Sequence, residues 1–176
     1  MRITAGELRH RIIEMTNLET TRETQDKVRG AIFNMIGPYI DSECTLDLFG
    51  GSGAMAIEAY SRGAKYIVIN DLNNKALECS KRNCNNLGIK DVKFYNLDYK
   101  DFVKNDDHKY DLIILDPPYK MDYIDEILDS VYPLLMDKCL IVFEMGIDSK
   151  YPLNFKDLEL IKNKEYGIKR VVVYKR

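Results

Sequence analysis

Residues 111–119 read Asp-Leu-Ile-Ile-Leu-Asp-Pro-Pro-Tyr, and the rest of the chain is organised around this stretch. Its apolar run has the length and the β-branched and leucine content of a strand that is buried in a parallel sheet. Pro117 and Pro118 have no N–H to donate to a sheet, so the strand must stop at Asp116. Ligands of open α/β sheets bind at the carboxyl ends of the strands. The stretch therefore predicts an α/β fold with a site at Asp116.

The corner at 116–119 offers a carboxylate, two proline carbonyls and the ring of Tyr119. These groups accept hydrogen bonds and stack, and none of them is basic or nucleophilic, so the corner suits a planar amine. The alternative is a turn into a helix, in which Asp116 caps the helix and the prolines fix φ. The four residues alone do not decide between the two.

A glycine turn precedes this corner in the chain. The apolar run 44–49 predicts a strand, Gly50-Gly51-Ser52-Gly53 follows it, and a helical run begins at Ala54. Glycines let the backbone approach a ligand closely, and the helix N-terminus presents free N–H groups. Asp71 ends the next expected strand, 66–70, where its carboxylate can accept hydrogen bonds from ribose hydroxyls. The alternative for Asp71 is a cap for the helix that starts near residue 73.

Two kinds of cofactor fit this turn. The spacing Gly51-x-Gly53-x-x-Ala56 also matches the dinucleotide-binding fingerprint, which is a weak signal alone. A dehydrogenase would place a histidine or a tyrosine–lysine pair beside the hydride acceptor, and neither His10 nor His108 follows an expected strand. Asp47, ahead of the glycines, is more typical of a methyl-donor site. The residues therefore favour a methyl donor.

The alternation of strands and helices continues to the C-terminus. It predicts a mostly parallel seven-stranded sheet, closed by an antiparallel hairpin, and a short β-hairpin within residues 1–15. We expect one domain, 1–176, made of an N-terminal extension at 1–23 and a catalytic core at 24–176. The other expected helices are 24–36, 74–87, 99–105 and 122–136, and the other expected strands are 92–95, 140–143, 157–164 and 168–174.

Composition and charge narrow the class of protein. The chain has 176 residues, of which 45% are hydrophobic and 31% charged, as in an ordinary globular protein. No apolar run approaches membrane-spanning length and the N-terminus does not resemble a signal peptide, so we expect a cytoplasmic protein without membrane contact. The four cysteines include no Cys-x-x-Cys pair, so no metal is expected. Basic residues gather at both ends of the chain, either as solvated tails or as a phosphate-contacting surface.

Taken together, these motifs resemble the class I S-adenosylmethionine-dependent methyltransferases, and more narrowly the RsmD family, which methylates a guanine of 16S ribosomal RNA. The resemblance covers nearly the whole chain. It rests on the opening 2–6, the segment 28–34, Asp47-Leu48-Phe49-Gly50-Gly51-Ser52-Gly53 and the stretch 111–119. The chain departs from the family at Arg22-Glu23-Thr24, where an Arg-Pro-Thr sequence is usual.

The resemblance implies a Rossmann-like fold with S-adenosylmethionine across the carboxyl ends of the first four strands. Asp71 would meet the ribose, and Asp98 the adenine amine, although a helix cap is the structural alternative for Asp98. The residues that it implies for cofactor binding are Asp47, Phe49, Gly51, Ser52, Gly53, Asp71, Leu72, Leu97 and Asp98.

The resemblance also implies direct methyl transfer to the exocyclic N2 amine of a flipped-out guanine, without metal. Asp116 and the carbonyl of Pro117 would accept hydrogen bonds from the amine, and Tyr119 would stack on the base unless it is a packing aromatic. The implied partner is 16S rRNA within the small ribosomal subunit or an assembly intermediate, and a monomer is expected. The implied RNA-contacting residues are Arg2, Arg9, Arg11 and Arg22.

Three other functions stay open at this point. A methyltransferase of the same fold can act on an amine of DNA, of transfer RNA or of a protein glutamine. A non-catalytic RNA-binding protein can keep the cofactor fold, although an intact Asp116 corner argues against this. A nicotinamide dehydrogenase is the most distant alternative.

Overall fold

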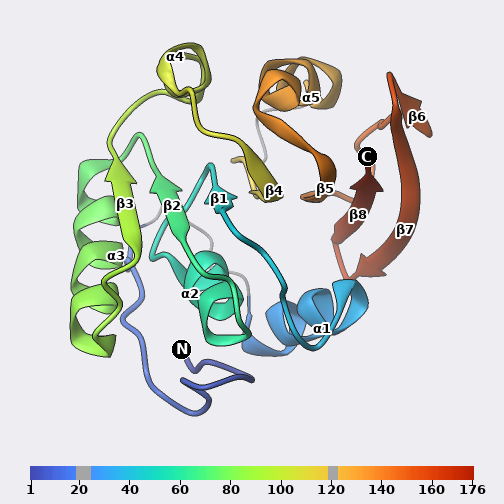
Figure 1. The fold of residues 1–176 in the computed structure, drawn as a ribbon. Coiled ribbons are helices and arrows are strands. Elements are labelled where there is room, and N and C mark those ends of the chain that lie inside the picture. Colours follow the sequence, from blue (N-terminus) through green and yellow to red (C-terminus); the bar gives the residue numbers. More distant parts are fainter. Residues whose placement is uncertain (19–24, 119–122) are drawn as a thin grey trace.

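The computed structural model describes residues 1–18, 25–118 and 123–176, in which helices alternate with strands up to β5 (Figure 1). The helices are α1 Asp26–Ile36, α2 Ala54–Ser61, α3 Asn74–Leu87, α4 Tyr99–Asn105, α5 Ile124–Val131 and the short 3₁₀ helix η1 Tyr132–Leu134. The strands are β1 Thr45–Asp47, β2 Ile67–Asn70, β3 Val92–Tyr95, β4 Tyr110–Leu115, β5 Leu135–Gly146, β6 Asn154–Phe155, β7 Leu158–Tyr166 and β8 Lys169–Lys175. None of the described helices is long and apolar enough to cross a membrane.

The strands form one sheet in the order β3-β2-β1-β4-β5-β8-β7-β6. Strands β1 to β5 pair in parallel, and β6, β7 and β8 pair antiparallel. The predicted α/β fold with a C-terminal antiparallel hairpin is therefore confirmed. The predicted number of seven strands is wrong, because β6 adds an eighth. This strand has two residues and pairs with the first two of β7, which is too short to leave a periodic pattern.

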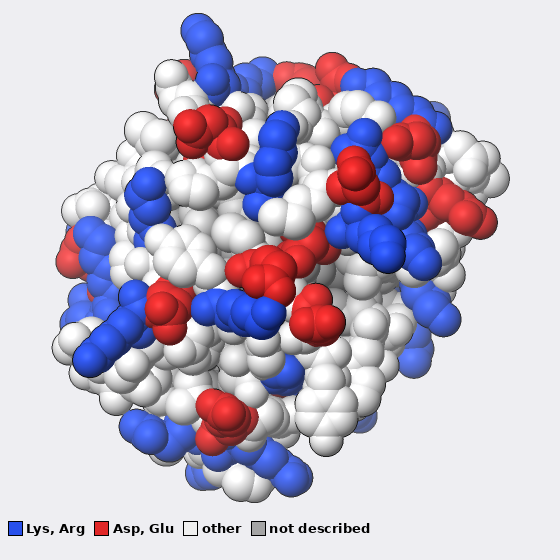
Figure 2. Space-filling model, viewed as in Figure 1, with Lys and Arg blue, Asp and Glu red and all other residues white. Residues whose placement is uncertain are grey.

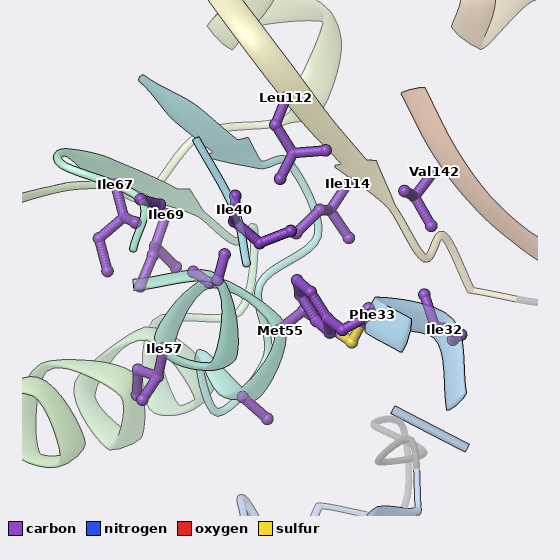
Figure 3. Close-up of a cluster of buried hydrophobic side chains, with 14 of the residues drawn as sticks. Ile32, Phe33, Ile40, Met55, Ile57, Ile67, Ile69, Leu112, Ile114 and Val142 are labelled. Atoms are coloured by element: carbon purple, nitrogen blue, oxygen red, sulfur yellow. The ribbon is translucent and has the colours of Figure 1, made fainter. Parts of the chain in front are cut away.

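Both faces of the sheet are covered (Figure 1), with α1, α2 and α3 on one face and α4 and α5 on the other. Alternate residues of each strand enter the two cores, as the period of a strand requires. On β4, Leu112 and Ile114 join the first core, whereas Ile113 and Leu115 join the second. Figure 3 shows Phe33 of α1 and Met55 of α2 between the helices and the β4 side chains of the first core.

One predicted helix is shorter than expected. The pattern at 122–136 continues through Pro133, but α5 ends at Val131 and Pro133 lies in η1. Proline lacks the N–H that an α-helix needs, so the chain tightens there. It then enters β5 at Leu135, which pairs with Tyr110 before a break in register. The register shifts between this pair and the next one, Leu112 with Leu140. The start of β5 includes the charged residues Asp137 and Lys138, so the sequence there shows no strand pattern and only 140–143 was predicted as a strand.

The predicted N-terminal hairpin is present as one antiparallel bridge, between Arg2 and Ile12, rather than as two full strands. It is docked against the core, because Ile3 and Ile13 are buried in the first core cluster. Gly6 approaches α2 so closely that a Cβ atom would lie 1.7 Å from the carbonyl oxygen of Ser61. No larger residue fits there, so Gly6 fixes the position of the hairpin.

A buried carboxylate on α2, Glu58, holds the hairpin and α1 together. Its oxygens accept hydrogen bonds from the Thr4 amide at 3.0 Å and the Thr4 hydroxyl at 2.5 Å. They also accept from Arg29 Nε at 3.2 Å and Arg62 Nε at 2.9 Å. All three charged side chains are at most 1% exposed. Sequence reasoning did not identify this network.

The pKa of Glu58 is lowered from its ordinary value. Burial acts to raise this pKa, but the hydrogen bonds from Thr4 and Arg62 and the charge of Arg29 outweigh the effect of burial. Because the folded-state pKa lies below the unfolded one, the charged carboxylate stabilises the fold above the unfolded-state value. That contribution is lost as the pH falls through the folded-state pKa.

We expect Glu58→Gln to lower the free energy of unfolding by about 3 kcal/mol at pH 7, because two buried guanidinium groups lose their countercharge. The difference from the wild type should begin to shrink as the pH falls below the ordinary glutamate pKa and should vanish once the pH has fallen through the lowered folded-state pKa of Glu58. Urea unfolding at pH 7 and at pH 3.5 measures both effects. Glu43→Gln, which removes an exposed pair with Lys65, is the control and should cost at most about 0.5 kcal/mol. An unchanged midpoint for Glu58→Gln at pH 7 would contradict this account.

Candidate active site at the strand ends

Four acidic residues predicted from the sequence lie along one edge of the sheet. Asp47 is the last residue of β1, and Asp71 and Asp116 directly follow β2 and β4. Asp98 follows β3 and precedes α4. Because β3, β2, β1 and β4 are neighbours in that order, the four carboxylates occupy successive strand ends. The chain thus gathers hydrogen-bond acceptors where open α/β sheets bind ligands.

The register places three of these acids on the same face of the sheet. Asp47 is opposite Ile69 on one side and Ile114 on the other. Asp71 and Asp116 are each two residues beyond those partners, and side chains two apart along an extended chain point the same way. This face is the one that α1, α2 and α3 cover.

The glycine turn is held by two of these carboxylates. The Gly51 amide donates to Asp71 Oδ2 at 2.8 Å, and the Ala56 amide donates to Asp47 Oδ2 at 3.2 Å. Gly51 and Gly53 have φ values of 56° and 79°, in the left-handed region that favours glycine. A Cβ atom on Gly53 would also lie 2.9 Å from the Cβ of Ser80 on α3. The glycines are therefore needed for the backbone conformation of the turn and for its packing against α3, whether or not a ligand binds there.

The structure separates the alternatives for Asp71 and Asp98. Asn73 is the cap of α3, because its side chain accepts from the amides of Lys75 and Ala76. Asp71 instead joins the glycine turn to the start of that helix, accepting from the Asn73 amide at 2.7 Å. Asp98 does cap α4, accepting from the Lys100 amide at 2.9 Å. The ligand-binding roles of both aspartates stay predictions.

Three apolar side chains that were expected near a cofactor lie beside these turns. Phe49 is half-buried, with its ring centroid 5.7 Å from that of Tyr99. Leu97 is half-buried, and Leu72 is 68% exposed. An exposed leucine beside a row of acids suits the flat ring of a ligand. The contact of these three side chains with a cofactor stays a prediction.

Sequence reasoning missed Asn70, which ties three strand ends together. Its Nδ2 donates to the carbonyls of Leu48 and Leu97, both at 3.1 Å, and its Oδ1 accepts from the Leu97 amide at 3.2 Å. The side chain is buried. The available signal was a polar residue at the end of an otherwise apolar strand, because a buried amide must find partners for its donors and acceptor.

Asn83 of α3 was missed for a similar reason. Its buried Nδ2 donates to the Ser52 carbonyl of the glycine turn at 2.9 Å and to the Glu14 carbonyl at 3.0 Å. Its Oδ1 accepts from the Glu14 amide at 2.8 Å. One amide side chain thus joins the segment after the N-terminal hairpin to the glycine turn.

The remaining predicted residues lie at the Asp116 corner and on the hairpin. Asp116 is half-buried and Pro117 is buried, whereas Tyr119 and Arg22 lie outside the described residues. Arg2, Arg9 and Arg11 are all exposed on the N-terminal hairpin. Figure 2 shows basic side chains along the lower edge of the molecule, where Figure 1 places this hairpin, and interspersed acids and bases elsewhere on the same face.

The site offers no cysteine nucleophile among the described residues. None of the four cysteines forms a disulfide, and burial raises the pKa of Cys44 to about 11 and those of Cys84 and Cys139 to about 12. One group in the described part of the chain has metal-ligand spacing, namely Asp106, Asp107 and His108. It precedes β4, at the opposite end of the strand from Asp116. The chemistry of the site therefore rests on carboxylates, backbone amides and carbonyls.

Comparison with known proteins gives consistent matches over the full chain. Residues 1–175 match the family described as "Conserved hypothetical protein 95". The Bacillus subtilis protein called "Putative rRNA methyltransferase YlbH" is 34% identical, over 100% of this chain and 99% of its own. The ribosomal RNA small subunit methyltransferase D of Haemophilus influenzae is 32% identical, over 96% and 90%. The solved Escherichia coli structure called "Putative methyltransferase yhhF" has a TM-score of 0.88 and 25% identity, over 100% and 97%.

We expect Asn70→Ala to destabilise the fold by about 2 kcal/mol, because it leaves the Leu48 and Leu97 carbonyls and the Leu97 amide without their partner. Hydrogen exchange at residues 96–98 should accelerate more than exchange in β5, since only the ends of the first three strands lose a tie. Mass spectrometry of exchanged peptides measures this. Asn105→Ala removes an exposed hydrogen bond and should leave exchange at 96–98 unchanged. Uniform acceleration across the whole sheet would contradict a local role for Asn70.

Proposed function

The chain belongs to the family described as Conserved hypothetical protein 95, together with the small subunit methyltransferase D proteins, and from that premise we propose its reaction. The proposed reaction is transfer of a methyl group from S-adenosylmethionine to the exocyclic N2 amine of a guanine in 16S ribosomal RNA. The observation that carries the proposal is the row of four aspartates at adjacent strand ends, beside a glycine turn.

The residues present fit this cofactor. S-adenosylmethionine has an ammonium, a sulfonium, two ribose hydroxyls and an adenine amine, so it needs several acceptors and few donors. Asp47, Asp71 and Asp98 supply those acceptors at the ends of β1, β2 and β3 in turn, and the glycine turn would contact the amino-acid end of the cofactor. Leu72 and Leu97 offer an apolar surface for the adenine ring. When bound, the cofactor supplies an electrophilic methyl group on sulfur.

The chain itself then has to hold the target amine. Asp116 and the carbonyl of Pro117 accept its two N–H bonds, which aims the nitrogen lone pair at the methyl group and fixes the line of attack. The Asp116 carboxylate also stabilises the positive charge that forms on the nitrogen and accepts the proton that leaves. Because the base must enter a site at the strand ends, it is flipped out of its RNA context. Tyr119 stacks on the flipped base.

The N-terminal hairpin is the proposed RNA-contacting surface, with Arg2, Arg9 and Arg11 as phosphate ligands, and Arg22 of the segment that follows is a further proposed RNA contact. The small ribosomal subunit or an assembly intermediate is the proposed substrate, which places the enzyme in the cytoplasm, and a monomer suffices. Three exposed arginines on one short hairpin support this proposal, because phosphate contacts dominate the affinity of proteins for RNA.

We expect Asp116→Ala to lower kcat about 10² to 10³-fold while the affinity for S-adenosylmethionine changes little, because the lost group acts on the amine. The assay supplies tritiated S-adenosylmethionine with small subunits from cells that lack the endogenous enzyme, and with naked 16S RNA, transfer RNA and duplex DNA in parallel. Calorimetry measures cofactor binding by the same variants.

Label that enters 16S RNA alone, is recovered as N2-methylguanine and is lost in Asp116→Ala supports the proposal. Asp125→Ala, which removes an exposed acid of α5, is the control and should keep full activity. Label in another nucleic acid would refute the proposed substrate. Full activity of Asp116→Ala would refute the proposed role of Asp116.

We expect the double change Arg9→Ala and Arg11→Ala to weaken RNA binding and to reduce the slope of log affinity against log salt by about 1.5, because each phosphate contact contributes about 0.7 to 0.9. Filter binding over a range of salt concentrations measures the slope. Lys138→Ala is the matched control, since this exposed lysine lies on the early part of β5, at the other end of the strand from the acids. An unchanged salt slope in the double variant would remove the hairpin from the RNA interface.

A further inference from the structure

A buried ion pair lies one strand beyond the Asp116 corner and has no part in the reaction described so far. Lys169 Nζ of β8 contacts Glu144 Oε1 of β5, and the two side chains are 10% and 3% exposed. It is the one buried acid–base pair that the described strands place at the carboxyl edge. The other ion pairs of the described residues with both side chains buried join Glu58 to Arg29 and to Arg62, on the helical layer.

The register puts this pair beside Asp116. In the parallel pairing of β4 with β5, Leu115 is opposite Phe143, and Asp116 and Glu144 are the next residues of the two chains. Neighbouring strands are about 4.8 Å apart, and residues in register point to the same face. Val142 and Ile114 lie in the first core cluster, so Glu144 and Asp116, two residues further on, face the same side.

Lys169 and Tyr166 continue the row across the hairpin. Lys169 is in register with Gly146 of β5 and with Tyr166 of β7, so its side chain shares a face with that of Tyr166. The Tyr166 hydroxyl is buried and has no hydrogen-bond partner among the described residues. A buried hydroxyl without a partner costs free energy unless a ligand supplies one.

A purely structural role explains this arrangement poorly. Burying two opposite charges gains little over a well-packed apolar pair, because desolvation offsets their attraction. The neighbouring positions on these strands, including Val142, Val171 and Val173, are apolar and fully packed. A charged pair at this one end of the two strands, with an unsatisfied hydroxyl beside it, indicates a polar ligand.

We propose that Glu144 and Lys169 read the edge of the target base, with Glu144 accepting from N1–H and Lys169 donating to O6 of guanine. This inference rests on the proposed function, because it assigns the guanine specificity of that same site. Asp116 holds the reacting amine, and the acceptor–donor order of Glu144 and Lys169 matches the remaining polar edge of guanine. Adenine has an acceptor at N1 and a donor at N6, so it would face like groups and bind poorly. The buried Tyr166 hydroxyl supplies a further donor.

Binding of four nucleotides tests this assignment without any methyl transfer. GMP and IMP share O6 and N1–H, whereas AMP and 2-aminopurine riboside monophosphate lack both. The protein with S-adenosylhomocysteine is titrated with each nucleotide and followed by NMR. We expect GMP and IMP to bind at least about tenfold more tightly than the other two, since a hydrogen bond to a charged group is worth about 1.5 kcal/mol or more.

Glu144→Gln should reduce this preference to about twofold, because the amide can present its oxygen to N1–H or its NH₂ group to an unprotonated N1. Lys169→Gln tests the O6 contact independently and carries the test if thermal melting shows that Glu144→Gln does not fold. Glu165→Gln is the matched control on the same hairpin, since Glu165 pairs with Arg170 instead, and it should keep the wild-type preference.

Equal binding of all four nucleotides by the wild type, including no measurable binding of any, overturns the assignment. A preference that survives in both variants also overturns it. If the protein methylates rRNA but shows no nucleotide preference, this inference fails and the proposed function stays. If it shows the preference but methylates no rRNA, the proposed function fails and the base-reading role of Glu144 and Lys169 stays.

Discussion

A single buried carboxylate, Glu58, decides how the N-terminal part of the chain meets the sheet. It brings together a hairpin amide and hydroxyl, an arginine of α1 and the arginine that directly follows its own helix, so three segments that are distant in sequence share one charge. Two buried guanidinium groups cannot remain beside each other without it. Because α2 begins at the glycine turn, the same helix carries that turn at one end and the docking point of the hairpin along its side.

The candidate site is distributed over the ends of several strands, and this makes it sensitive to their relative alignment. No single loop contains the site, so the loops that form it must be fixed relative to one another. Asn70 does this across the ends of β1, β2 and β3, and Asn83 does it between the glycine turn and the segment at Glu14. These two amides touch no predicted ligand, yet they position the groups that would.

The sequence allowed the fold and the strand-end acids to be predicted, because both follow from local pattern. Helix α3 and strand β3 match their predicted bounds. Asn73 and Gly88 mark the two ends of α3, and turns mark the ends of β3. The family was also correctly identified, from the opening 2–6, the segment 28–34, the run 47–53 that contains the glycine turn, and the stretch 111–119. Glu58, Asn70 and Asn83 were not found, because a polar residue in an apolar pattern does not reveal its distant partners. The two-residue β6 was missed because it is too short to show a period.

The outer edge of the sheet has a consequence for how copies of this chain behave when crowded. Strand β7 pairs with β8 along its inner edge, whereas β6 pairs only with Leu158 and Glu159. Most of the outer edge of β7 therefore presents backbone donors and acceptors without a neighbouring strand in the described structure. Such an edge is a template on which another molecule can add a strand. Lys162 and Lys164 project from it and are exposed. Mutual repulsion of these ammonium groups opposes edge-to-edge stacking, so two lysines far from the candidate site protect this edge of the sheet.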